Sequence, residues 1–339
     1  MLCARSPLRI DFVGMTDYHV ACDQFGGRIL NATINKYIYA TLRPRDDRKV
    51  ILQAPDHGVV VEVPDPSELS AAGQLGLAQH IIRRMGVNQG LELTTYSEMP
   101  GGAGLGSSST IATCVISILS AFLGHRLTNF DIAEMAIECE KTALDTEYGW
   151  QDQYSPVTGG GVKYMVHWPR TDTRDIEIDI LPLGPDMIVE IEKRMVVAYS
   201  GLSRPAKGIL DKVAEGVARE DPEVVVALKG MSDCAEEMRR ALLRSRLEDL
   251  GPLLSLTWEH HKRLHPDVTN ECLDRLHECA TQHGATGGRV CGAGGGGTMI
   301  FFCAQNAEYP VKEALRALGA SVFDFSIDRH GLYLWGQRD

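Results

Sequence analysis

A run of glycine and serine between Met99 and Thr110, MPGGAGLGSSST, contains residue types that bind phosphate through the protein backbone. The residues before it read as a strand, and those after it read as a helix. Small residues at such a junction let several backbone N–H groups converge on an anion, and the start of the helix adds a favourable dipole. The run therefore predicts a phosphate-binding loop, and a membrane span and a flexible turn are the alternatives.

Two better-known phosphate loops do not fit this run. A Walker loop requires a lysine ahead of its last residue, and the run contains no lysine. The dinucleotide fingerprint GxGxxG would need a glycine at Ser107 and an acidic residue about 20 positions later. A second run, CGAGGGG at 291–297, does match GxGxxG, but a predicted strand follows it where a helix is required. We therefore expect no dinucleotide fold.

Three histidines, at 260, 261 and 265, form the other group that could do chemistry. His261 and His265 are four residues apart and would share one face of a helix, as a pair of zinc ligands does. The stretch WEHHKRLHPD has no HExxH order, and no carboxylate in it has metal-ligand spacing. We therefore expect a solvated helix face there.

The elements that must position these residues begin with strands. Apolar and polar residues alternate over 27–43 and 49–63, which predicts paired strands of a half-buried sheet. Helices are expected over 66–86, directly after the glycine loop, and over 128–144, where Thr128 or Asn129 can cap the first turn.

Near residue 185 the sequence has a cluster of turn residues followed by a strand-like stretch, which suggests a domain boundary. Amphipathic helices follow, with strands at TMIFFC and GLYLWG, and the expected helices are 205–219, 222–245, 247–265 and 270–283. The length of 339 residues exceeds the size at which one core keeps growing, so two domains are expected.

Composition excludes several classes of function. The formal net charge is −11 with both signs interspersed, so no basic stripe is available to bind nucleic acid. Nine cysteines without a CxxC pair are typical of reduced, mostly buried thiols in the cytoplasm. The N-terminus reads as a strand and has no signal-peptide pattern. Serine and threonine interrupt the uncharged run 99–124, which predicts a buried helix and no membrane partner.

PGGAGLGSSST (100–110) resembles the central ATP-binding motif PxxxGLGSSAA of the GHMP kinases, the superfamily of galactokinase, homoserine kinase and mevalonate kinase. SPLRIDFVGMTDY (6–18) resembles the N-terminal substrate motif of the superfamily, and GRVCGAGGGGTMIFF (288–302) resembles its C-terminal glycine motif. The three motifs occur in the expected order over nearly the whole chain.

The resemblance implies a two-lobed α+β GHMP kinase fold. It has an N-terminal ATP-binding domain over 1–185, like ribosomal protein S5 domain 2, and a ferredoxin-like α/β C-terminal domain over 186–339. The resemblance also implies ATP and Mg²⁺ as cofactors. The residues that it assigns to ATP are Pro100, Gly101, Gly102, Ala103, Gly104, Leu105, Gly106, Ser107, Ser108 and Ser109.

The same resemblance assigns the metal, the catalytic groups and the acceptor. Ser108 and Glu140 would bind Mg²⁺, with Glu138 as a local competitor to Glu140. Asp152 would orient the acceptor hydroxyl, and Arg9 would keep that carboxylate ionised. The residues that would contact the acceptor are Thr16, Asp17, Tyr18, Asp152, Gly294, Gly295 and Arg204, with Lys207 as a further candidate. Arg204 and Lys207 could equally be ordinary exposed basic residues at the start of a helix.

Within the superfamily, WQDQYSPVTGGG (150–161), SGLSRPAKGIL (200–210) and the residues over 268–297 are most similar to D-glycero-D-manno-heptose 7-phosphate kinases. This implies transfer of the γ-phosphate to the anomeric C1 hydroxyl of a heptose 7-phosphate, giving a heptose 1,7-bisphosphate for nucleotide-sugar biosynthesis. Those kinases tend to have three glycines before TDY, where this chain has Gly14-Met15, so the sugar pocket is expected to differ.

Several alternatives stay open at this stage. They are a kinase for a free sugar such as fucose or galactose, a diphosphomevalonate decarboxylase of the same fold, and a non-catalytic regulator that binds sugar and ATP. We expect a cytoplasmic protein whose partners are a small sugar phosphate and ATP, and a homodimer is left open.

Overall fold

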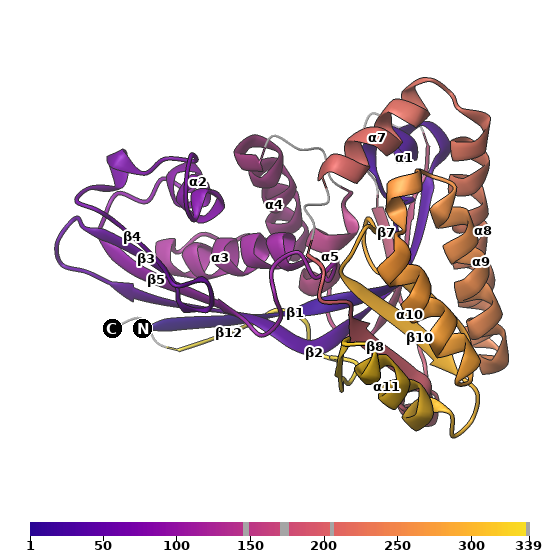
Figure 1. Cartoon of the computed structure of the whole chain (residues 1–339). Helices are drawn as coiled ribbons and strands as arrows, with labels where there is room; N and C mark the ends of the chain where they lie inside the picture. The colour runs from indigo at the N-terminus through magenta and orange to yellow at the C-terminus, as the bar shows by residue number, and fades with distance from the viewer. Residues whose placement is uncertain (145–148, 170–175, 204–206, 337–339) are drawn as a thin grey trace.

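The computed structural model of the chain describes residues 1–144, 149–169, 176–203 and 207–336, and these residues form two β-sheets with surrounding helices (Figure 1). The larger sheet has the order β12-β1-β2-β5-β3-β4, and β6 and β7 extend it beside the first half of β2. Its strands are β1 (Leu2–Val13), β2 (Gly27–Pro44), β3 (Val50–Ala54), β4 (Val59–Val63), β5 (Leu91–Ser97), β6 (Val162–His167), β7 (Ile176–Ile180) and β12 (Tyr333–Gly336).

An 18-residue strand, β2, connects the two halves of this sheet. Its first residues, Gly27–Ala32, pair antiparallel with β6, and its last residues pair antiparallel with β5. The stretch 49–63 forms the hairpin β3–β4, joined by a 3-10 turn at Pro55–His57. The strands predicted from alternation are therefore confirmed in both places.

The smaller sheet is wholly antiparallel and has the order β11-β8-β10-β9. Its strands are β8 (Met195–Tyr199), β9 (Ala285–Val290), β10 (Thr298–Cys303) and β11 (Ser321–Phe323). Helix α9 packs on β9 and β10, and α8 packs between α9 and strand β2 of the larger sheet (Figure 1). Arg28, near the start of β2, forms an ion pair with Asp233 of α8, so α8 lies beside that end of the strand.

The helices of the described residues are α1 (His19–Phe25), α2 (Gly76–Arg84), α3 (Ser107–Leu123), α4 (Asn129–Leu144), α5 (Gln151–Val157), α6 (Pro185–Arg194), α7 (Lys207–Ala218), α8 (Pro222–Leu243), α9 (Leu250–Lys262), α10 (Glu271–Gln282) and α11 (Glu308–Ala317). Helix α3 lies against β1 and β2, and α4 and α2 cover it (Figure 1). This arrangement buries most of α3, including the whole stretch 112–120, as predicted for the uncharged run. No helix in the described ranges is long and apolar enough to span a membrane.

Local signals explain where several helices begin and end. Helix α3 ends at Gly124, which has a left-handed φ of 75°. Thr128 precedes α4 and its hydroxyl accepts a hydrogen bond from Asp131 N, so the predicted cap is confirmed. The helix predicted over 66–86 is too long, because the regular helix begins only at Gly76 after a left-handed Leu75 (φ 55°).

The last strand of the described residues, β12, belongs to the larger sheet. β12 pairs antiparallel with β1, with Leu2 opposite Gly336 and Arg5 opposite Tyr333. Residues near the end of the chain therefore complete the larger sheet, although the chain between 195 and 323 forms the smaller one. The division into domains at 185 stays a prediction.

The expectation of a solvated histidine face is wrong for His261. Its side chain is fully buried, packs edge-on against Trp258 and lies 3.3 Å from Arg289 Nη2. Burial, and the nearby arginine, hold the pKa of His261 well below its usual value. His265 lies beyond the end of α9 and caps a 3-10 turn, so the two histidines do not share a helix face. All nine cysteines are free, and most are buried.

Candidate active site

A cavity of about 220 Å³ lies where the three predicted motifs meet. Its walls come from β1 and the turn after it, the glycine loop with the start of α3, the start of α5, and the C-terminal glycine run. The predicted site residues that line it are Arg9, Asp17, Tyr18, Gly102, Gly104, Gly106, Ser107, Ser108, Ser109, Glu140, Asp152 and Gly294.

Some residues of the glycine loop do not line the cavity. The side chains of Ala103 and Leu105 are fully buried and anchor the loop in the core. Pro100 and Gly101 precede the cavity, and Gly101 O accepts a hydrogen bond from Ser203 Oγ at 2.9 Å.

Two predicted acceptor contacts, Thr16 and Gly295, also lie away from the cavity lining. Thr16 is buried behind the cavity, where its hydroxyl donates to Arg28 O at 2.7 Å. Gly295 N–H donates to Val268 O at 2.7 Å. Arg204 lies outside the described residues. Lys207 is the first residue of α7, the helix whose Leu210 lines the cavity.

Glycine is needed at alternate positions of the phosphate loop. Gly102, Gly104 and Gly106 have φ values of 72°, 76° and 78°, which side-chain-bearing residues rarely adopt. A Cβ on Gly104 would also lie 2.7 Å from the carbonyl oxygen of Cys291. The loop leads directly into α3, whose first N–H groups have no partner within a helix. This arrangement, which faces the cavity, is typical of helix starts that bind anions.

Backbone hydrogen bonds hold this loop between the two sheets. Arg9 N donates to Leu105 O at 3.2 Å, which fixes the loop to β1. Thr298 N donates to Ala103 O at 2.8 Å, which fixes it to β10 of the smaller sheet. The glycine loop is therefore fixed to a strand of each sheet.

Arg9 and Asp152 form a bidentate ion pair on the cavity wall. Arg9 Nε and Nη2 donate to the two carboxylate oxygens of Asp152 at 2.7 and 2.9 Å. Both residues line the cavity, but the side chain of Arg9 is 4% exposed and that of Asp152 is 25% exposed, so the carboxylate is the more accessible partner. Burial opposes the charge of Arg9, but Asp152 and Asp11 outweigh it and raise the pKa of the guanidinium. The arginine therefore stays charged and orients a carboxylate that has room to accept another hydrogen bond.

Glu140 is a buried carboxylate at the edge of the same cavity. Its Oε1 accepts from Ser108 Oγ at 2.7 Å, and its Oε2 accepts from Gln153 Nε2 at 2.6 Å. It is 1% exposed, and burial raises its pKa, with hydrogen bonds from Ser108 and Gln153 opposing the rise. Its competitor Glu138 is exposed and forms an ion pair with Arg84 on the surface. The position of Glu140, together with its burial, favours it over Glu138 as a cavity residue.

Asp17 is held by the start of α5. Gln151 N donates to Asp17 Oδ2 at 3.0 Å, and Gln151 Nε2 lies 3.3 Å from Oδ1. A Cβ on Gly149 would lie 1.9 Å from Asp17 Oδ2, so glycine is required beside the carboxylate. Burial raises the pKa of Asp17 to about 7, with the hydrogen bond from Gln151 opposing the rise and the charge of Asp152 adding to it.

Sequence reasoning missed one buried ionic contact behind the site. Asp11 and Arg289 are both fully buried, and Asp11 Oδ2 lies 3.6 Å from Arg289 Nη1. Asp11 also accepts from Gly292 N at 3.2 Å, so it fixes the C-terminal glycine run to β1. Asp11 is two residues after Arg9, and residues two apart share one face of a strand. That spacing is the signal that could have identified Asp11.

The family models for the N-terminal and C-terminal domains of GHMP kinases match residues 74–160 and 238–321. The chain is 32% identical to the D-glycero-alpha-D-manno-heptose 7-phosphate kinase of Campylobacter jejuni, over 98% of both chains. A structure described as a D-glycero-D-manno-heptose 1-phosphate kinase from Bacteroides thetaiotaomicron superposes with a TM-score of 0.82, at 25% identity and covering 100% of both chains. A galactokinase of Lactococcus lactis, complexed with galactose, shares the fold with a TM-score of 0.78 at 21% identity, over 98% of this chain and 95% of that one.

Proposed function

The chain belongs to the GHMP kinase family and is a phosphotransferase with an alcohol acceptor, and from this premise we propose which acceptor it uses. The proposal is transfer of the γ-phosphate of ATP to the anomeric hydroxyl of a heptose 7-phosphate, giving a heptose 1,7-bisphosphate. One structural observation supports this proposal. The Arg9–Asp152 pair faces the same cavity as the phosphate loop, so the group that would hold the acceptor hydroxyl lies beside the helix start that would hold the phosphates.

The phosphates of the nucleotide are proposed to bind the loop 100–109. Phosphoryl transfer depends mainly on positioning and on electrostatic stabilisation. Negative charge on the γ-phosphate oxygens is therefore best stabilised by hydrogen-bond donors that are already in place. The left-handed glycines and the start of α3 supply such donors from the backbone. The hydrogen bonds from Arg9 N and Thr298 N fix that loop.

The donors around Glu140 fit Mg²⁺. Ser107 Oγ is buried without a hydrogen-bond partner. The buried carboxylate of Glu140 accepts a hydrogen bond from Ser108 Oγ, and no cation of the described residues pairs with it. Hard oxygen donors of this kind are those that Mg²⁺ prefers. We therefore propose Ser108 and Glu140 as its ligands, and the bound ion would neutralise charge on the phosphates. Gln153 would hold the Glu140 carboxylate in place from behind.

Asp152 is proposed to accept a hydrogen bond from the attacking hydroxyl. Because Arg9 already donates two hydrogen bonds to it, its basicity is limited and orientation is its main contribution. An anomeric hydroxyl is relatively acidic and tolerates such a weak base. Asp17, fixed by Gln151, would accept a hydrogen bond from a neighbouring sugar hydroxyl.

The 7-phosphate of the acceptor needs a cation that the described cavity lining does not supply, since Arg9 there is already paired with Asp152. Lys207, at the start of α7, and Arg204 before it are the proposed partners. The names of the two relatives differ on where their acceptors carry phosphate, at position 7 in one and position 1 in the other. This makes the phosphate position the sharpest point to test.

The alternatives differ in what they require of this site. A kinase for a free sugar would use the same Arg9–Asp152 pair and would need no cation for a second phosphate. A non-catalytic regulator would need neither the paired carboxylate nor the buried Glu140. The presence of both groups in one cavity favours an enzyme. A cytoplasmic location and assembly into a homodimer belong to the same proposal and rest on the family resemblance.

An acceptor panel tests the proposal. Purified protein is incubated with ATP and Mg²⁺, and ADP release is followed with D-glycero-D-manno-heptose 7-phosphate, the corresponding 1-phosphate, sedoheptulose 7-phosphate, and free fucose, galactose and mannose. The proposal expects kcat/KM to be highest for the aldoheptose 7-phosphate. Preferred turnover of a free sugar or of the 1-phosphate would overturn the assigned acceptor and keep the nucleotide site.

A further inference from the structure

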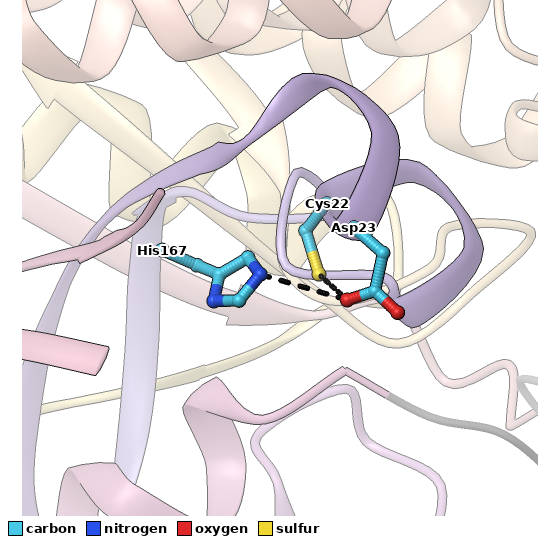
Figure 2. Close-up of side chains that lie close together, drawn as sticks. All are labelled: Cys22, Asp23 and His167. Atoms are coloured by element: carbon cyan, nitrogen blue, oxygen red, sulfur yellow. Dashed lines mark hydrogen bonds and ion pairs between the residues drawn. The ribbon is translucent and has the colours of Figure 1, made fainter. Parts of the chain in front are cut away.

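A cysteine, an aspartate and a histidine from two elements meet outside the active-site cavity (Figure 2). Cys22 and Asp23 lie on helix α1, and His167 is the last residue of strand β6. Cys22 Sγ lies 3.8 Å from Asp23 Oδ1, and His167 Nε2 lies 3.5 Å from the same oxygen. One ligand atom of each residue lies within 4.8 Å of those of the other two. Figure 2 shows the three side chains pointing toward one another.

These separations are close to those of a tetrahedral zinc site. Bonds of about 2.0 to 2.3 Å at tetrahedral angles place two ligand atoms about 3.3 to 3.6 Å apart. The sulfur–oxygen and nitrogen–oxygen distances exceed that range by only small amounts or not at all. The sulfur and the nitrogen lie within 4.8 Å of each other and would also have to approach, so side-chain rotations would bring all three atoms onto one ion.

The chemistry of the three ligand atoms selects the metal. A thiolate and an imidazole suit zinc, whereas Mg²⁺ prefers an octahedron of oxygen atoms. A thiolate and a carboxylate together carry two negative charges, which one Zn²⁺ neutralises. We propose that Cys22, Asp23 and His167 bind one Zn²⁺, with water in the fourth position.

The surrounding structure holds the ligands in place from both sides. Cys22 and His167 are 1% and 5% exposed, whereas the Asp23 side chain is 47% exposed. Gly27, which follows the helix closely, pairs with His167 in the β2–β6 register. Gly26, between the end of α1 and Gly27, has a φ of 73°, and a Cβ on it would lie 3.0 Å from His167 O. The glycine therefore permits the close approach of α1 to β6 that brings the ligands together.

Solvent reaches the three residues at the half-exposed Asp23, and of the three only His167 lines a neighbouring cavity. A cavity of about 260 Å³, separate from the ATP site, is lined by His167 with Gly26, Gly27 and Trp168. The half-exposed Asp23 carboxylate can bind an ion from solvent first, and the buried sulfur and nitrogen can then bind the same ion. The open fourth position would then be filled by water, as in zinc sites with three protein ligands.

The position of α1 gives the ion a structural consequence. The helix follows directly on the turn that contains Asp17, and Tyr18 is its N-cap. An ion shared by α1 and β6 would tie that turn to the larger sheet. The zinc site is distinct from the proposed Mg²⁺ ligands, which are oxygen atoms of Ser108 and Glu140 in the other cavity.

Cobalt substitution tests the site without using activity. The full chain is treated with a chelator and a non-thiol reductant, and Co²⁺ is then titrated while the near-ultraviolet and visible spectra are recorded. We expect one equivalent to bind with a sulfur-to-cobalt charge-transfer band, and Zn²⁺ to abolish the band by displacement. Ions at the oxygen ligands of the ATP cavity would give no such band. Absence of the band in the wild-type chain would overturn the proposal.

Variants assign the band to individual ligands. Cys22→Ser should abolish it, and Cys272→Ser, at a half-buried cysteine on α10, should leave it unchanged. Because Cys22 is buried, Asp23→Asn provides a second test at a half-exposed residue. It should weaken zinc affinity by at least about tenfold in competition with a chelator. A band that survives in Cys22→Ser, or unchanged zinc affinity in Asp23→Asn, would show that the three side chains only hydrogen-bond to one another.

Discussion

The buried carboxylate of Asp17 should make the stability of the protein depend on pH. Burial raises its pKa from 3.8 to about 7, with Asp152 adding to the rise. In the unfolded chain the same carboxyl loses its proton near pH 4. Between these values the folded state therefore binds more protons than the unfolded state, and the free energy of unfolding falls as pH rises.

The size of the effect follows from this shift. Each pH unit within the window changes the free energy of unfolding by about 1.4 kcal/mol, and pH 5 to pH 7 covers roughly two units. Asp17→Asn removes the titrating group, and its amide oxygen can still accept from Gln151 N. We therefore expect the free energy of unfolding of Asp17→Asn to rise relative to wild type by about 2 to 3 kcal/mol between pH 5 and pH 8.

Urea unfolding followed by tryptophan fluorescence at pH 5, 6, 7 and 8 measures this difference. Asp211→Asn, at an exposed aspartate on α7, is the control and should follow the wild-type profile. The reasoning is refuted if Asp17→Asn and the wild type have parallel profiles across this range. It is also refuted if the difference between them shrinks as pH rises, because that is the behaviour of a carboxyl whose pKa is lowered.

Three further changes test other parts of the site. Asp152→Asn should lower kcat by about 10² to 10⁴ and leave nucleotide affinity unchanged in a fluorescence binding assay, because the orienting carboxylate is lost; a kcat near that of wild type would contradict its role. Glu140→Gln should raise the Mg²⁺ concentration needed for half-maximal rate at least about tenfold, while Glu138→Gln should not, and equal magnesium dependence of the two variants would refute the assignment. Asp11→Asn leaves Arg289 buried without its anion and should lower the free energy of unfolding by about 3 to 5 kcal/mol, and a loss below about 1 kcal/mol in denaturant titration would contradict that.

The conformation of the glycine loop could largely be predicted from the sequence, because it depends on residue types that are close together in the chain. Glycines with left-handed φ and a following run of small residues are needed wherever a strand enters a helix around an anion. The capping of α4 at Thr128 and the hairpin β3–β4 follow from equally local rules. In each case the deciding contacts lie within a few residues in the chain.

The features that were missed depend on contacts between distant parts of the chain. His261 was expected on a solvated face, but the fully buried Arg289, 28 residues later in the chain, lies beside it. Trp258, three residues earlier on the same helix, is the one contact that the local sequence could have indicated. The turn of Thr16 toward Arg28 O, away from the cavity, depends on where β2 begins. The helix expected over 66–86 is an exception, because its late start is local: Gly73 and Leu75 have left-handed φ values, and Gly73 could have indicated the break.

The central claim is that the new phosphate is attached to the anomeric oxygen of a sugar that already carries one. Phosphorus NMR of a reaction with D-glycero-D-manno-heptose 7-phosphate, ATP and Mg²⁺ tests it directly. We expect the 7-phosphate signal to persist while a second phosphate signal appears, coupled to the anomeric proton, with one ADP formed per acceptor. A second phosphate coupled to any other proton, or ADP formed without a new sugar phosphate, would contradict it.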